Sequence, residues 1–311
     1  MQVVPREGES ALSVSGPRPM EWSTVLYAGP QGPGKNGKQH KSSLESPIML
    51  LTDGNVIASG SHDKEIFLWY IHGECKNFMV MRGHKNAVLD LHWTTDGSQI
   101  ISASPDKIVR VGCRGWKTDK EIGRTLLFCE FMLCCLSAGG LHLFGSDYGT
   151  AKLWEMRPKG AIQTFPDKYQ ITAASFSDIS DKIFTGVIDN DIKVRDIRKG
   201  EVTMTLEGHQ DMITGMQLSP DGSYLLMNGM DNKLCIWDMR PFAPQNRCVK
   251  IFEGHQHNNF EKNFWSPDGS MVTAVQIAWL IYESVNECVF HPTEPIFGSC
   301  SSDKQIYLGE I

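Results

Sequence analysis

Histidine, aspartate and serine recur in this sequence in an arrangement that could support nucleophilic catalysis. His84 precedes Asp106 by the same number of residues that separates His209 from Asp231. In a serine hydrolase, a histidine held by a carboxylate removes the proton from a serine hydroxyl. An active site needs such a set once, whereas a structural brace needs it in every copy of a repeated unit. The repetition therefore favours a structural role, so we assign no catalytic residue and do not expect an enzyme.

Other residue types that could bind a metal or react covalently do not form a recognisable site. His255 and His257 could hold a metal ion, but no carboxylate or cysteine stands at a matching spacing. The nine cysteines form neither a paired Cys-x-x-Cys motif nor a secreted disulfide framework, which fits free thiols in the cytosol or nucleus. A phosphate-binding loop and a nucleophile elbow are also missing. We therefore expect no metal, no cofactor and no small-molecule substrate.

The charge balance and the apolar runs argue against two further classes of protein. The chain carries 30 Lys and Arg against 36 Asp and Glu, a net charge of −6 at pH 7. Because nucleic acids are bound by neutralising phosphates, any contact with RNA is expected to be indirect or weak. The longest apolar run, Thr125–Leu136, is shorter than the roughly 20 residues that span a bilayer, so no membrane association is expected. The charged N-terminal residues are not followed by the apolar segment of a secretory signal.

The chain divides into two parts of different composition. Residues 1–46 are rich in Gly, Pro, Ser and Lys and show no periodicity, so we expect a disordered tail. Residues 47–311 contain short runs of Val, Ile, Phe, Leu and Trp, separated by Gly, Asp, Asn and Ser. These runs have the length of strands and are too short for helices. The second part is therefore predicted to be an all-β domain.

An internal repeat orders the predicted strands. Its copies place an aspartate before a turn and a strand, at intervals of about 42 residues. Three copies carry a tryptophan at the end of that strand, and Gly-His pairs precede some copies. The marks are Asp63, Asp106, Asp189, Asp231, Asp303, Trp69, Trp154, Trp237, His84 and His209. A repeat of this length predicts one four-stranded sheet per copy.

The period together with the Gly-His and Trp-Asp marks resembles the WD-repeat family of β-propellers. The resemblance implies that histidine, the turn aspartate, a strand serine or threonine and tryptophan form a buried hydrogen-bonded brace in each blade. Buried carboxylates need such donors. Only the repeat Gly208–Asp238 keeps the Gly-His pair, the turn aspartate and Trp-Asp together. The expected fold is a seven-bladed propeller with two incomplete blades.

Several longer segments are similar to the WD-repeat subunits of the spliceosomal U5 small nuclear ribonucleoprotein. The most distinctive is Trp237–Gly254, and Ile188–Arg198, Phe260–Ser270 and Phe290–Ile296 continue the similarity. The resemblance implies a non-enzymatic scaffold of pre-mRNA splicing in the nucleus, with proteins of the U5 particle and of the spliceosome as partners.

The sequence departs from that pattern in several places. Leu51–Gly54 leads almost directly into the next strand, and Val275–Asn286 joins the middle of one repeat to the next, which predicts the two incomplete blades. Cys113–Phe144 has the expected length but not the expected residues. We expect Ile48–Leu51 to be the outer strand of the blade completed by Ile306–Glu310. Single marks are also replaced, at Gly112, Tyr148, Arg195 and Ala278.

Several interpretations of function stay open at this point. A splicing scaffold is favoured, and another propeller adaptor, such as a ubiquitin-ligase substrate receptor or a signalling scaffold, is an alternative. A decayed gene copy with little function is a third. For partner binding, the best candidate is the patch Arg240, Pro241 and Phe242, because Arg and aromatic residues dominate interface hot spots. The same residues could instead be only a turn that links two strands.

Overall fold

The computed structural model describes most of the chain between Ile48 and Glu310. The described residues are 48–50, 53–73, 77–106, 108–113, 132–136, 141–146, 149–155, 161–253, 264–273, 285–301 and 306–310. Every secondary-structure element in these ranges is a β-strand, which confirms the predicted all-β fold. A helix able to cross a membrane does not occur in them. Asp303 and the predicted tail, residues 1–46, lie elsewhere in the chain, so the expectations for them stay predictions.

The described strands form seven antiparallel sheets, each built from consecutive strands. The first sheet contains β1 (Ile48–Leu50), β2 (Val56–Gly60), β3 (Glu65–Tyr70) and β4 (Asn77–Arg82). The second contains β5 (Asp90–Trp93), β6 (Gln99–Ser104) and β7 (Ile108–Cys113). The third contains β8 (Met132–Leu136), β9 (Leu141–Ser146), β10 (Thr150–Glu155) and β11 (Ala161–Pro166).

The remaining sheets continue the same up-and-down order. The fourth contains β12 (Ile171–Phe176), β13 (Lys182–Val187), β14 (Ile192–Asp196) and β15 (Val202–Leu206). The fifth contains β16 (Ile213–Leu218), β17 (Tyr224–Gly229), β18 (Lys233–Asp238) and β19 (Cys248–Glu253). The sixth contains β20 (Phe264–Trp265) and β21 (Val272–Thr273), and the seventh contains β22 (Val285–Phe290), β23 (Ile296–Ser301) and β24 (Ile306–Glu310).

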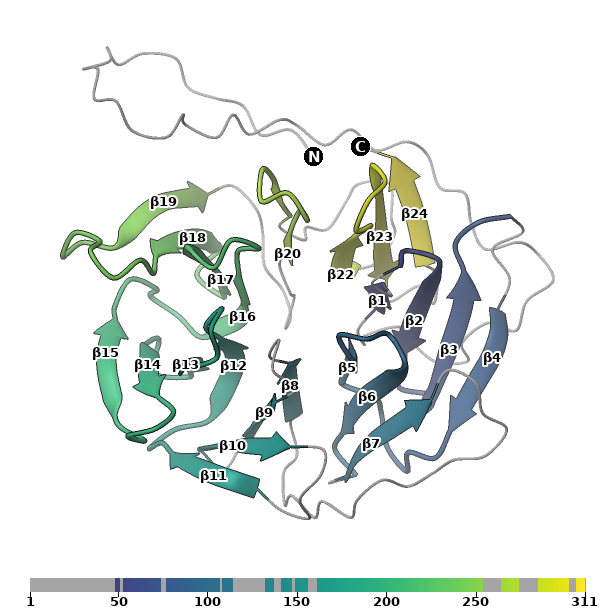
Figure 1. Cartoon of the computed structure of the whole chain (residues 1–311), viewed down its shortest axis with the longest axis horizontal. Coiled ribbons are helices and arrows are strands. Elements are labelled where there is room, and N and C mark those ends of the chain that lie inside the picture. The colour runs from purple at the N-terminus through teal and green to yellow at the C-terminus, as the bar shows by residue number, and fades with distance from the viewer. Residues whose placement is uncertain are drawn as a thin grey trace, which may run out of the picture.

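The sheets stand around a common axis (Figure 1). The strands nearest that axis are β1, β5, β8, β12, β16, β20 and β22. Each of these strands contacts the next around the circle, and β22 contacts β1. Radial sheets arranged in this way form a β-propeller, in which each sheet is one blade.

Burial within a blade follows from this arrangement. In the fifth sheet, nearly every residue of β17 and β18 is buried, because both faces of these strands pack against neighbouring blades. The outermost strand, β19, instead alternates between half-buried and exposed residues. The continuous apolar runs of the sequence are therefore the middle strands of blades.

The turn aspartates shape the hairpins between the two middle strands of the blades. In four sheets, the aspartate carboxylate accepts the backbone N–H two residues further on, at distances between 3.1 and 3.4 Å. In three of these turns the intervening residue has a left-handed φ, 72° at Lys64, 72° at Asn190 and 60° at Asn232. Asparagine tolerates this conformation well, and the aspartate side chain fixes the turn. These aspartates are Asp63, Asp106, Asp189 and Asp231.

The prediction that Ile48–Leu51 closes the last blade was wrong. In the structure β1 pairs with β2 as the inner strand of the first sheet, with Ile48 opposite Ser59 and Leu50 opposite Ile57. The connection between β1 and β2 is too short to reach another blade, so the chain folds back as a hairpin. The missing inner strand is thus replaced, and in the described residues the seventh sheet ends at β24.

The other departures from the repeat have different outcomes. Cys113–Phe144, whose residues did not fit the pattern, still supplies β8 and most of β9, and these strands pair with each other. The part of Val275–Asn286 that includes Ala278 is not among the described residues. Before it, the sixth sheet consists of the short strands β20 and β21.

Side-chain packing joins the seventh sheet to the first. Ile57 and Trp69 share one buried cluster with Val289 and Ile306. At the same junction, buried His291 donates a hydrogen bond from Nε2 to the carbonyl oxygen of Gly54, at 3.0 Å. We call this junction the seam. In the described residues, the ring is closed at the seam by packing and this hydrogen bond, since strand pairing across it is not present.

Candidate functional site

The second sheet contains the histidine–aspartate–serine arrangement that the sequence indicated. His84 lies in the link from β4 to β5, and Asp106 lies in the turn between β6 and β7. His84 Nδ1 lies 2.9 Å from Asp106 Oδ2, and His84 Nε2 lies 2.8 Å from Ser102 Oγ. The Lys85 N–H also donates to Asp106, at 2.8 Å. These hydrogen bonds therefore tie the link from β4 to β5 to the turn between β6 and β7.

The electrostatics of this group suit a brace. The His84 and Asp106 side chains are only 2% and 3% exposed. Burial lowers the pKa of His84, against the opposing effect of Asp106, so the imidazole is neutral at pH 7. A neutral imidazole donates from Nδ1 to Asp106 and accepts at Nε2 from the Ser102 hydroxyl. A serine nucleophile would also need an open substrate site, and Ser102 is buried.

The fifth sheet was expected to hold the one complete brace, but a hydroxyl is missing from it. His209 Nδ1 lies 3.1 Å from both carboxylate oxygens of Asp231, as predicted from the spacing. His209 Nε2 and Trp237 Nε1 are buried and have no hydrogen-bond partner among the described residues. The position that corresponds to Ser102 is occupied by Met227, which is fully buried. In the first sheet, by contrast, Trp69 Nε1 donates to Ser59 Oγ at 2.9 Å.

Met227→Ser tests this difference directly. Met227→Ser and Met227→Ala both remove buried side-chain volume and should both destabilise the protein, by about 2–5 kcal/mol for alanine. Serine also supplies a hydroxyl between His209 and Trp237, so we expect Met227→Ser to be about 1–2 kcal/mol more stable than Met227→Ala. Urea unfolding of both variants measures this difference. A serine variant no more stable than the alanine variant would show that the two nitrogens are not bridged.

The remaining predicted marks are only partly supported by hydrogen bonds. Trp154 Nε1 is buried and lacks a hydrogen-bond partner within the part of the chain that the structure describes. Asp63 and Asp189 hold their turns, as described above. Tyr148 and Asp303 lie in stretches for which the structure gives no description.

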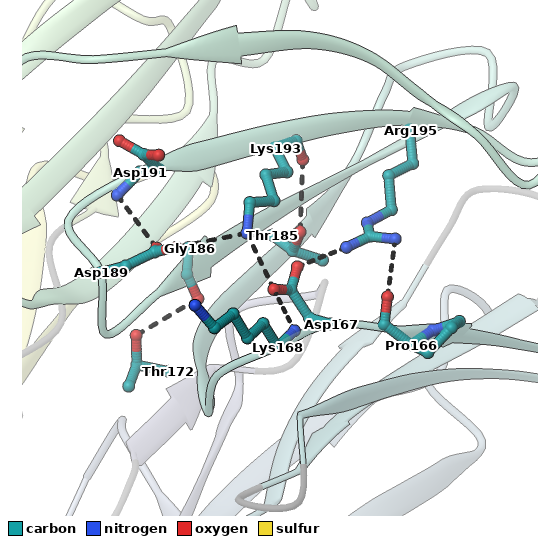
Figure 2. Close-up of polar contacts among 10 residues, drawn as sticks. All are labelled: Pro166, Asp167, Lys168, Thr172, Thr185, Gly186, Asp189, Asp191, Lys193 and Arg195. Atoms are coloured by element: carbon teal, nitrogen blue, oxygen red, sulfur yellow. Dashed lines mark hydrogen bonds and ion pairs between the residues drawn. The ribbon is translucent and has the colours of Figure 1, made fainter.

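In the fourth sheet, charged side chains stand where the braces of other sheets have histidine and tryptophan. Asp167 follows β11 at the position that histidine occupies in the second and fifth sheets, and Arg195 stands at the tryptophan position of β14. Arg195 donates to the Asp167 carboxylate and, from Nη1, to the Pro166 carbonyl oxygen at 3.1 Å. Lys193 Nζ reaches Asp167 at 2.8 Å and Asp189 at 3.3 Å. Figure 2 shows Asp167 held between the two cations.

Burial and charge act in opposite directions on this cluster. Burial raises the pKa of the Asp167 carboxyl, but the hydrogen bond from Lys193 and the charge of Arg195 outweigh burial, so the pKa lies below its ordinary value. Burial likewise lowers the pKa of Lys193, but Asp167 and Asp189 outweigh it and raise the pKa. Asp167 and Lys193 are therefore both ionised at pH 7. Sequence reasoning noted Arg195 as a departure but missed Asp167, although its spacing to Asp189 equals that from His209 to Asp231.

The candidate partner-binding residues lie in the loop between β18 and β19. Pro241 is exposed, and Phe242 is 99% exposed. Arg240 donates from Nε to the Asp238 carboxylate, at 2.9 and 3.1 Å, and its Cζ lies 5.4 Å from the centre of the Tyr224 ring. The hydrogen bond from Arg240 lowers the pKa of Asp238. Arg240 thus shapes the loop, and Phe242 is the side chain that projects from it.

Three residues at the seam could hold a metal ion, but the ring nitrogens of His291 are already hydrogen-bonded. His72, His291 and Glu294 offer ligand atoms within 4.8 Å of one another. His291 Nδ1 accepts backbone N–H groups from Thr293 and Glu294, while its Nε2 donates to Gly54. Both ring nitrogens of His291 are therefore engaged. His255 and His257 are not among the described residues.

Comparison with known proteins agrees with this architecture. Residues 43–70, 75–111 and 200–238 match the family described as WD domain, G-beta repeat. The propeller ring and the braced blades thus define a WD-repeat protein.

Relatives of similar length narrow the assignment. The chain is 42% identical to the U5 small nuclear ribonucleoprotein 40 kDa protein of Dictyostelium discoideum, over 88% of this chain and 87% of the relative. It is 45% identical to the protein of the same name in Homo sapiens, with the same coverage. Identity to pre-mRNA-splicing factor cwf17 of Schizosaccharomyces pombe is 36%, over 83% of this chain and 82% of the relative. The chain belongs to the family of U5 small nuclear ribonucleoprotein 40 kDa proteins.

Proposed function

We propose that this chain is a non-enzymatic protein-interaction scaffold of the U5 particle in pre-mRNA splicing and that it acts in the nucleus. The observation that carries the proposal is the identity of 42–45% to U5 small nuclear ribonucleoprotein 40 kDa proteins along most of the chain. The repetition of histidine–aspartate pairs in two blades supports a structural role for His84, Asp106, His209 and Asp231. Partners are proteins of the U5 particle and of the spliceosome.

The ring also bears on the alternative that this is a decayed copy. The described residues form seven sheets, and the middle strands of the first, fourth and fifth are largely buried, which favours a folded product. A scaffold acts through exposed loops on such a rigid frame. We propose the patch Arg240, Pro241 and Phe242 as one partner-binding loop, in which Phe242 makes the contact and Arg240 holds the loop.

Affinity purification tests the proposal. The tagged full chain, expressed in cells and recovered from nuclear extract, should bring down U5 proteins. Recovery of ubiquitin-ligase subunits without splicing proteins would favour another adaptor, and an aggregated product would favour a decayed copy.

Phe242→Ala should reduce the recovery of at least one splicing protein by about tenfold, because exposed aromatic anchors dominate binding energy. The matched control is Ile179→Ala, which removes a 76% exposed side chain from the loop between β12 and β13 and should change nothing. Equal recovery with Phe242→Ala and Ile179→Ala would reject the patch.

A further inference from the structure

The loop between β18 and β19 combines length, exposure and charge. It is longer than the loops that join the two outer strands in the first, third and fourth sheets. The hairpin that it closes exposes three large apolar side chains, Phe242 at 99%, Val249 at 58% and Ile251 at 48%. We call these residues, with Arg240 and Arg247, the hairpin surface.

The loop is held in one conformation by polar contacts. Arg247 Nη1 donates to the carbonyl oxygens of Asp238 and Arg240, at 3.0 and 2.9 Å. The Ala243 N–H donates to the Arg240 carbonyl oxygen at 3.3 Å, which closes a turn around Phe242. A fully exposed aromatic ring on a braced loop is preorganised for binding, since little conformational freedom is left to lose.

In the described residues, only one of the two arginines beside Phe242 is hydrogen-bonded to a carboxylate. Asp238 is the carboxylate that binds Arg240, and Arg247 donates only to backbone carbonyls in the described residues. Asp221 acts on Arg240 more weakly, through charge alone. The Arg240 side chain is 50% exposed, so its guanidinium can meet an additional carboxylate.

We propose that the hairpin surface binds an acidic segment of a partner protein, whose apolar side chains pack on Phe242 and whose carboxylates meet Arg240 and Arg247. This inference rests on the proposed scaffold function and adds the chemistry of the partner. Guanidinium groups recognise carboxylates through paired hydrogen bonds, and an aromatic ring between them supplies the apolar contact.

A protein segment fits this surface better than RNA. Val249 and Ile251 extend the exposed apolar surface along β19, which suits the apolar side chains of a protein segment. Single-stranded RNA is bound by several stacked aromatic rings, and among the described residues of this surface Phe242 is the one exposed aromatic. The net charge of −6 also opposes binding to a phosphate backbone.

Selection from a random-peptide display library on the purified full chain tests the inference. We expect the enriched peptides to combine acidic residues with aromatic or large aliphatic ones. Phe242→Ala should weaken the binding of a synthesised enriched peptide by at least about tenfold, which corresponds to an ordinary aromatic hot spot. The Ile179→Ala chain should bind that peptide as the unchanged chain does. Raising the salt concentration should weaken binding several-fold, because exposed charges are screened.

Four results would overturn the inference: no enrichment, enrichment of basic or neutral peptides, equal affinity of the Phe242→Ala chain, or binding of labelled oligouridine at this surface in place of the peptide. Its failure is distinguishable from failure of the proposed function. If U5 proteins still purify with the chain but no acidic peptide binds, the scaffold function stands and the assignment of this surface is wrong. If an acidic peptide binds but no U5 protein is recovered, the assignment of the hairpin surface stands and the proposed scaffold function is wrong.

Discussion

Gly54→Ala is expected to lower the free energy of unfolding by about 3 kcal/mol, because two costs add. Gly54 has φ of +74°, where a side chain is strained by about 1 kcal/mol. A Cβ atom there would also lie 2.1 Å from His291 Nε2, so the buried imidazole must move. Its movement breaks the hydrogen bond to the Gly54 carbonyl and disturbs those from Thr293 and Glu294. Urea unfolding or a thermal melt measures the loss.

Gly73→Ala is the matched control for this experiment. Gly73 also has a positive φ, +81°, but a Cβ atom there would meet nothing within 4 Å. Gly73→Ala should therefore cost only the backbone strain, about 1 kcal/mol. His291→Ala removes the clash, so the double change Gly54→Ala with His291→Ala should cost less than the sum of the two single changes. Equal losses for Gly54→Ala and Gly73→Ala would show that the seam does not depend on His291.

The seam is also where sequence reasoning reached its limit. The apolar run at Ile48 was predicted to be a strand and is one, because local residue types decide whether a segment is extended. The blade to which this strand belongs depends on the length of the connection to β2 and on which sheet has an unpaired edge strand. Neither is encoded in the apolar run itself. Only a few residues separate β1 from β2, and β1, the nearest strand in sequence, takes the inner place beside β2.

A similar distinction applies to the braces. The resemblance to the WD-repeat family implied that His84 meets Asp106 and that His209 meets Asp231, and both pairs are in contact. Their equal spacing places them equally in equivalent blades. Residue types at the other positions of the brace could not be inferred from the marks. Met227 stands where a hydroxyl was expected, and at the fourth sheet two marks changed together, to Asp167 and Arg195. Such paired changes become visible only when the residues are seen in contact.

Asp167→Asn should be the most destabilising single change in the fourth sheet. The Asp167 and Arg195 side chains are 2% and 6% exposed, and Lys193 is 17% exposed. Removing the carboxylate leaves buried Arg195 with the Pro166 carbonyl oxygen and half-buried Lys193 with the more distant Asp189. Breaking a buried ion pair from one side costs about 3–5 kcal/mol, because the remaining charge is uncompensated. Denaturant unfolding at pH 7 measures this loss.

Glu65→Gln makes the same carboxylate-to-amide change in an exposed pair. Glu65 binds Arg82, whose side chain is 60% exposed, so solvent screens the interaction and the loss should stay below about 1 kcal/mol. Adding Arg195→Leu to Asp167→Asn removes the uncompensated guanidinium and should recover part of the stability. A loss no larger for Asp167→Asn than for Glu65→Gln would contradict the assignment of a buried charged brace.

The dependence on pH gives an independent test of the same cluster. The pKa of Asp167 is lowered from its ordinary value of 3.8 in the folded chain, so the stability it supplies is present above that value and is lost as pH falls through the folded pKa. The pKa of Lys193 is raised from 10.5, so its contribution is present below that value and is lost as pH rises through the folded pKa. The difference in stability between the unchanged chain and Asp167→Asn should therefore stay constant through neutral pH and shrink towards strong acid. The brace of the second sheet differs, because burial lowers the pKa of His84 from its ordinary value of 6.5. The stability that neutral His84 supplies is therefore lost as pH falls below that value, before the carboxyl range is reached.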